Sequence, residues 1–110
     1  MRIRLRDEAG LHDGTFQWKV VQRDPAGSAI ALGSVDDGEY RIRFPRLATF
    51  AFRAGEGEMR VASAPTTPSH VVEDLFRTAA LPLMLQVEGY EAIHASAVQM
   101  RGGVVAFCGF

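Results

Sequence analysis

Apolar and polar residues alternate along most of the first 64 positions, and this period of two is typical of strands that bury one face. The clearest case is the stretch in which Tyr40, Ile42 and Phe44 alternate with Arg41 and Arg43. We expect these two arginines to lie on a solvated face of a sheet. The same pattern predicts six strands, over residues 1–6, 15–22, 28–32, 40–44, 47–54 and 59–63.

The two strands expected nearest the N-terminus each carry a distinct pattern. Arg2, Arg4 and Arg6 alternate with apolar residues, which predicts an edge strand with its arginines on the wet face. In the range 15–22, Phe16 and Trp18 alternate with polar residues, so we expect both aromatic side chains on the buried face of a strand.

Short segments rich in turn-forming residues separate the strands. Asp24-Pro25-Ala26-Gly27 and Gly55-Glu56-Gly57 are typical of tight turns. The adjacent carboxylates Asp36 and Asp37 have the composition of a catalytic pair, but between glycines turn formation is the favoured interpretation. Connections this short predict an antiparallel meander, and we assign residues 1–64 to one antiparallel β unit.

A helix is predicted after this unit, where apolar residues begin to recur at four-residue spacing. We expect Thr67 to be its N-cap, Pro68 to occupy its first position and Gly89 to end it. Pro82 falls inside the pattern and should kink or divide the helix. The apolar face is wide enough to pack into a core, and its central ridge is formed by Val72, Phe76, Ala80 and Met84.

The sequence ends with a predicted hairpin, whose strands cover residues 93–100 and 104–107. Two turns are compatible with the glycines between them. A loop at Arg101-Gly102 places Ser96 opposite Phe107 and His94 opposite Gly109. A loop at Gly102-Gly103 places Ser96 opposite Gly109 instead.

The second strand of this hairpin is entirely apolar, as in a strand buried on both faces, and Gly109 follows it. A buried strand commonly leads into a phosphate-binding loop, G-x-x-x-x-G-K-S/T. Gly109 fits its first glycine and Phe110 its first variable position. The lysine and hydroxyl residue are absent from these 110 residues. A lone glycine after a strand is also common without any such loop.

The order of elements around Gly109 strengthens the interpretation that this glycine begins a phosphate-binding loop. A helix that closes on Gly89 is followed by His94-Ala95-Ser96-Ala97-Val98, a glycine turn and the apolar strand. This order resembles the HPr kinase/phosphorylase family, and most of all its stand-alone HPr-kinase-like proteins. The specific match covers about residues 40–110 and is sharpest from His94 to Gly109.

The resemblance implies an intact protein that phosphorylates a serine of a small protein or peptide, with ATP and Mg²⁺ as cofactors. It implies that His94 acts at the phosphate site and that Gly109 and Phe110 begin the nucleotide-binding loop. Ser96 is a weaker nucleotide-binding candidate, because its hydroxyl more commonly bonds local backbone. The family's catalytic aspartate is not among these residues, so residues 1–110 alone should bind no cofactor strongly.

Composition narrows the classes of function. A net charge of −1 argues against nucleic acid as a partner, and no apolar run is long enough to span a membrane. The single cysteine, Cys108, suits a reducing cytoplasm. His12 and His70 have no ligand partners at metal-site spacing, so we expect no metal centre. The bare edges of the last strand predict self-association, including a homo-oligomer.

The predicted fold class is therefore α+β: an antiparallel β meander, one kinked amphipathic helix, and a hairpin whose last strand is the first core strand of a P-loop kinase domain. We assign residues 65–110, the helix and the hairpin, to the start of that domain. Two other functions remain open. One is a P-loop nucleotide-binding protein without kinase activity, and the other is a small non-catalytic binding domain.

Overall fold

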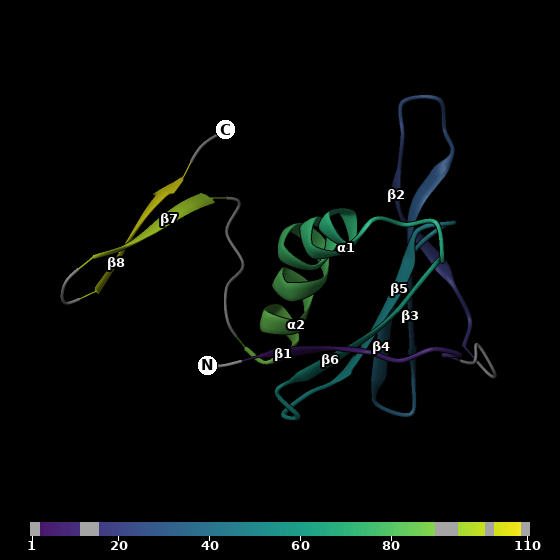
Figure 1. Ribbon diagram of the computed structural model, residues 1–110, viewed down its shortest axis with the longest axis horizontal. Helices are drawn as coiled ribbons and strands as arrows, with labels where there is room; N and C mark the ends of the chain where they lie inside the picture. The colour runs from purple at the N-terminus through teal and green to yellow at the C-terminus, as the bar shows by residue number, and fades with distance from the viewer. Residues whose placement is uncertain (1–2, 12–15, 90–94, 101–102, 109–110) are drawn as a thin grey trace.

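The computed structural model describes residues 3–11, 16–89, 95–100 and 103–108, and for the last two ranges it describes the backbone alone. The fold is α+β, as predicted, with a six-stranded sheet, one helix lying across it and a separate two-stranded hairpin (Figure 1). The six strands are β1 Arg4–Asp7, β2 Lys19–Arg23, β3 Ala29–Asp36, β4 Glu39–Phe44, β5 Ala48–Arg53 and β6 Glu58–Ser63.

Strands β2 to β6 form the predicted antiparallel meander, and the complete sheet has the order β1-β6-β5-β4-β3-β2. Strand β1 departs from that plan because it pairs with β6 in parallel. Parallel neighbours need a long crossover, and here the whole meander supplies it. The local alternation of arginines with apolar residues could therefore predict β1 as an edge strand but not the direction of its pairing.

The expected turns are present where glycine or aspartate permits a positive φ. Asp37 and Gly38, with φ of 48° and 76°, form the two-residue turn between β3 and β4, so Asp36-Asp37 belongs to a turn, as predicted. Between β4 and β5, Arg46 adopts a φ of 67°, a conformation that glycine or asparagine reaches at lower cost.

One face of the sheet, which we call the inner face, packs against the helix. Phe50, Phe52 and Met59 are completely buried there, and Met84 of the helix is buried opposite them. Phe76 is only partly buried, but its ring stacks on that of Phe50 with centroids 6.5 Å apart. The helix therefore shares one hydrophobic core with β1 and with β3 to β6, while the predicted division after residue 64 stays a prediction.

The helix consists of α1 Ser69–Leu75, a π-helical turn η1 Phe76–Ala80, and α2 Leu81–Val87. The proline at position 82 does not end the helix. The wider π-helical turn ends at Ala80, and Pro82, which has no N–H to donate, lies at the start of α2. Gly89, with φ of 95°, closes the helix as predicted.

The predicted N-cap is wrong by one residue. The helix starts at Ser69 with Pro68 as its N-cap and no side-chain cap. The Thr67 hydroxyl donates instead to the carbonyl oxygen of Leu47 at 2.9 Å. This bond ties the segment before the helix to the β4–β5 turn, so a tertiary contact replaces the local one.

The strand predicted at 15–22 is also shifted, because β2 begins only at Lys19. Phe16 and Trp18 lie before it, outside the sheet ladder, and are half-buried.

Both edges of the sheet carry features that discourage further pairing. The register of β2 shifts twice and its ends are Lys19 and Arg23, whereas β1 is short and carries arginines.

The hairpin consists of β7 Ala95–Met100 and β8 Gly103–Cys108, which pair only with each other in the part of the chain described. Met100 pairs with Gly103, Val98 with Val105 and Ser96 with Phe107. The first of the two predicted registers, with the loop at residues 101–102, is therefore confirmed.

Candidate functional site

The predicted site surrounds the end of β8. The structure places Ser96 in β7 opposite Phe107, and β8 ends at Cys108, immediately before Gly109. His94, Gly109 and Phe110 lie outside the described residues, so their predicted roles at a phosphate site stay predictions. Of the predicted site residues, only Ser96 is thus located, and only by the backbone.

The face of the sheet away from the helix, which we call the outer face, carries a chain of ion pairs that sequence reasoning missed. It starts at the exposed edge, where Arg6 Nε lies 3.0 Å from Glu58 Oε1 and Arg6 Nη2 lies 3.5 Å from Glu8 Oε1. Glu8 Oε2 lies 3.5 Å from Nη1 of Arg60. Arg60 in turn pairs with Glu39, which leads the network to the middle of the sheet.

Glu39 is the central member of this network because its two carboxylate oxygens accept from two arginines. Oε2 accepts from Nε of Arg41 at 2.8 Å, and Oε1 accepts from Nη2 of Arg60. The strand register places Ala51 between the two arginines, directly opposite each of them. The small side chain of Ala51 leaves space in which both guanidinium groups can reach the carboxylate.

Burial increases along the network, from a side chain 56% exposed at Arg6 to 9% at Glu39 and 7% at Arg41. Burial alone raises the pKa of Glu39, but the hydrogen bonds and positive charges of Arg60 and Arg41 outweigh it and lower that pKa below the ordinary value. Glu39 therefore remains a carboxylate at neutral pH. Buried side-chain nitrogens and oxygens in the described residues all have partners.

The prediction that Arg41 and Arg43 are solvated is wrong for Arg41, which is buried, and incomplete for Arg43, which is half-buried. The guanidinium carbon of Arg41 lies 4.0 Å from the ring centroid of Phe16, and that of Arg43 lies 4.1 Å from the Trp18 ring. The Ser34 hydroxyl also donates to the carbonyl of Gln17 at 2.7 Å, which anchors this segment to β3. A segment distant in sequence thus covers both arginines.

The sequence did contain a signal for this arrangement. Phe16 and Trp18 have the same two-residue spacing as Arg41 and Arg43, so each ring can cover one guanidinium. Spacing alone cannot say which face of a strand another segment will cover. The pattern therefore becomes interpretable only once the segment is known to cross the outer face.

A hollow with a volume of about 530 Å³ lies where β2, β3 and β4 meet Leu83 of the helix. Its walls are mainly apolar, with Lys19 and Gln17 among the polar lining residues. A second hollow of about 260 Å³ lies between β1, β6 and the start of the helix. Only the first has a volume within the range usual for small-molecule sites.

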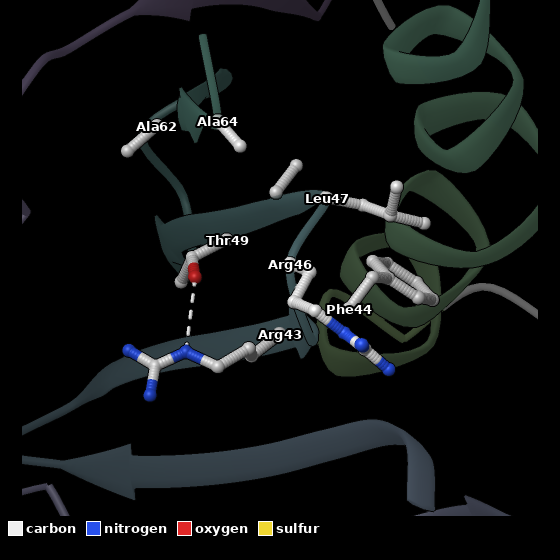
Figure 2. A pocket seen from close by; sticks show the side chains of 8 residues that line it. Arg43, Phe44, Arg46, Leu47, Thr49, Ala62 and Ala64 are labelled. Atoms are coloured by element: carbon white, nitrogen blue, oxygen red, sulfur yellow. Dashed lines mark hydrogen bonds between the residues drawn. The ribbon is translucent and has the colours of Figure 1, made fainter. Parts of the chain in front are cut away.

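A third hollow, of about 170 Å³, contains two arginines at the β4–β5 turn (Figure 2). Nε of Arg43 donates to the Thr49 hydroxyl at 3.2 Å. Figure 2 shows the side chain of Arg46 pointing away from that of Arg43. The two guanidinium groups therefore do not converge on one anion.

The described residues contain neither a cluster of metal-binding side chains nor a helix that could cross a membrane. They contain no group of three or more histidine, cysteine, aspartate or glutamate side chains placed to hold a metal ion. No helix in the part of the chain that the structure describes is both long and apolar enough to cross a bilayer.

Comparison of the chain with known proteins gives no match among family models, curated proteins or solved structures. Its function therefore has to be argued from its own residues.

Proposed function

We propose that this chain forms the N-terminal part of an HPr-kinase-like P-loop protein, which in its intact form transfers phosphate from ATP to a serine of a small protein or peptide. The observation that carries the proposal is the β7–β8 pairing, which brings an apolar strand to its end at Cys108, directly before Gly109. A strand that ends at a glycine is the start that a phosphate-binding loop requires.

The register also bears on the proposed role of His94. Ala95 pairs with Cys108, so an antiparallel ladder continued by one residue would place His94 opposite Gly109. An imidazole at that position can donate a hydrogen bond to a phosphate oxygen. The backbone N–H groups of the loop would supply further donors. A lysine and a hydroxyl residue that binds Mg²⁺ would come from the sequence beyond Phe110.

The first test is the coding sequence downstream of Phe110, which should continue the loop motif with a second glycine, a lysine and a serine or threonine. The complete polypeptide should then bind a fluorescent ATP analogue in the presence of Mg²⁺ and transfer labelled γ-phosphate to a serine-containing protein or peptide. Nucleotide binding without any transfer would instead favour a P-loop protein that is not a kinase.

The second test compares two histidines in that complete polypeptide. His94→Ala should lower the rate of phosphate transfer at least tenfold, because a donor to phosphate is lost. His70→Ala is the matched control, since His70 is exposed on the first turn of α1. Equal rates for the two variants would remove His94 from the phosphate site.

A second candidate function is non-catalytic binding of a small amphipathic anion in the 530 Å³ hollow. Gly33 lines this hollow from within β3, where its φ is not positive and its missing Cβ leaves space that the Val21 side chain partly uses. Glycine within a strand often marks a place where a ligand approaches closely. Lys19 supplies a cation in the same lining, beside the apolar Val21 and Leu83.

The two candidates respond differently to one substitution. Gly33 and Val21 both line the hollow, and a Cβ at position 33 would lie 3.1 Å from Cγ1 of Val21, so Gly33→Val should displace the Val21 side chain and reduce the space in the hollow. If the chain is a binding module, this variant should lose affinity for an aromatic carboxylate probe, measured by calorimetry. ATP binding and phosphate transfer in the complete polypeptide should be unchanged by the same substitution if the kinase proposal is correct.

A further inference from the structure

The helix has a second apolar surface that the six-stranded sheet does not cover. Residues of its inner side, such as Val72, Ala80 and Met84, belong to the core beneath it. The opposite side changes character along its length. Its N-terminal half carries the exposed side chains of Glu73, Asp74, Arg77 and Thr78. Its C-terminal half carries Leu81, Pro82 and Leu85, which are half-buried and outside the core cluster.

This change matters because one half of the same surface has the composition of a solvated helix and the other does not. Exposed helix surfaces normally remain polar, and a helix that is apolar all round is normally covered on every side. Leu81 and Leu85 are four residues apart, so their side chains form one continuous ridge. The ridge over 81–85 therefore has the character of a contact surface.

The β7–β8 hairpin is the part of the described chain that itself requires an apolar partner surface. A hairpin of two strands is at best marginally stable by itself, and β8 is apolar at every position after Gly103. It pairs with no strand of the larger sheet. Figure 1 shows the hairpin on the side of the helix away from the six-stranded sheet.

The connection between the two elements is long enough for contact. Residues 88–94 join the end of α2 at Val87 to the start of β7 at Ala95. At about 3.3 Å per extended residue, a segment of this length can reach at most roughly 23 Å, which exceeds the length of the ridge. The hairpin can therefore fold back onto Leu81 and Leu85 without any change in the helix.

We propose that the β7–β8 hairpin docks on the ridge formed by Leu81, Pro82 and Leu85, so that the helix is a middle layer shared by two sheets. The inner side of the helix fixes it to the six-stranded sheet, and its outer side positions the strand that ends before Gly109. This proposal rests on the apolar pattern and the chain connection. It does not depend on whether the protein binds ATP.

The wild-type chain offers a direct test by native-state hydrogen exchange. A docked hairpin should show amide protection in β7 and β8 that approaches the protection of β5, because opening it would require breaking a tertiary contact. Exchange of the hairpin amides near the rate of an unfolded peptide would overturn the proposal. Protection that appears only at high protein concentration would overturn it too, since a second copy would then cover the ridge.

Two adjacent helix residues give a matched pair of variants. Leu85→Glu places a charge on the ridge, whereas Gln86→Glu places the same charge on a neighbouring exposed position. The chain has one cysteine, Cys108 at the end of β8, and one tryptophan, Trp18 over Arg43 on the outer face. Thiol labelling therefore reports on the hairpin, and tryptophan fluorescence reports on the sheet.

Leu85→Glu should raise the rate of Cys108 labelling at least tenfold with the Trp18 emission spectrum unchanged, and Gln86→Glu should change neither. Equal labelling rates in the two variants would contradict docking. If Leu85→Glu also alters the Trp18 spectrum, the milder Leu85→Ser replaces it. That variant should lower hairpin amide protection at least tenfold relative to wild type, while leaving β5 protected, and unchanged hairpin protection would overturn the proposal.

Discussion

The two faces of the six-stranded sheet are held by different kinds of interaction, although the same strands supply both. On the inner face, Phe50 and Phe52 are completely buried under the helix. On the outer face, the buried residues Glu39 and Arg41 are held in an ion-pair network, and Phe16 covers Arg41. One face is stabilised by the apolar area it removes from water, whereas the other holds charges that have lost water and are paired with each other.

Because of this difference, the stability of the two faces should respond differently to amino-acid substitutions. An apolar core loses stability in proportion to the volume removed and is tolerant of similar shapes. A buried ion pair contributes little net energy when intact, because desolvation offsets attraction, yet it is costly to break from one side. On the outer face, replacing both partners of an ion pair should therefore cost less stability than replacing one partner alone.

The largest effect is expected at the centre of the inner face. Phe50→Ala should lower the free energy of unfolding by about 3–5 kcal/mol, because a completely buried aromatic ring is lost and a cavity remains. Phe50→Leu should cost well under half as much. Urea denaturation followed by circular dichroism measures both, and a loss below about 1 kcal/mol for Phe50→Ala would mean that the helix does not seal this core.

The second effect belongs to the centre of the outer face. Glu39→Gln should lower the free energy of unfolding by about 2–3 kcal/mol, because Arg41 and Arg60 lose their shared carboxylate. Glu58→Gln is the control, since its pair with Arg6 is exposed and should contribute less than about 1 kcal/mol. Equal losses for the two variants would show that burial does not distinguish the two ends of the network.

The third prediction concerns acid. Because the folded-state pKa of Glu39 lies below its ordinary value of 4.5, the carboxylate stabilises the fold at pH values above 4.5. That contribution is lost as the pH falls from 4.5 through the lowered folded-state pKa. The stability difference between wild type and Glu39→Gln, from denaturation curves at several pH values, should therefore shrink below pH 4.5. A difference that grows on acidification would reverse the assigned sign.

The smallest effect is expected where the aromatic segment covers the outer face. Trp18→Leu keeps much of the apolar contact but removes the ring from the Arg43 guanidinium, and should cost about 0.5–1 kcal/mol. A double-mutant cycle with Arg43→Met isolates this contact from other effects. A coupling energy indistinguishable from zero would mean that the ring covers Arg43 without attracting it.

Much of this fold was accessible from local patterns. The alternation of Tyr40, Ile42 and Phe44 with arginines identified β4 and its inner face, and the glycines at 102 and 103 allowed the hairpin register that the structure contains. The site was less accessible. The network around Glu39 joins residues from β1, β4 and β6 together with Glu8, and no local pattern specifies which of them meet.

The sequence by itself determined the α+β class, most strand positions, the end of the helix at Gly89 and the turn at Asp37, because each follows from the conformational preferences of a few neighbouring residues. Only the tertiary structure decided the parallel pairing of β1 with β6, the hydrogen bond from Thr67 to Leu47 and the burial of Arg41. These features depend on which distant segments share a surface. A single strand pattern records that a residue alternates between faces, but it does not record what covers each face.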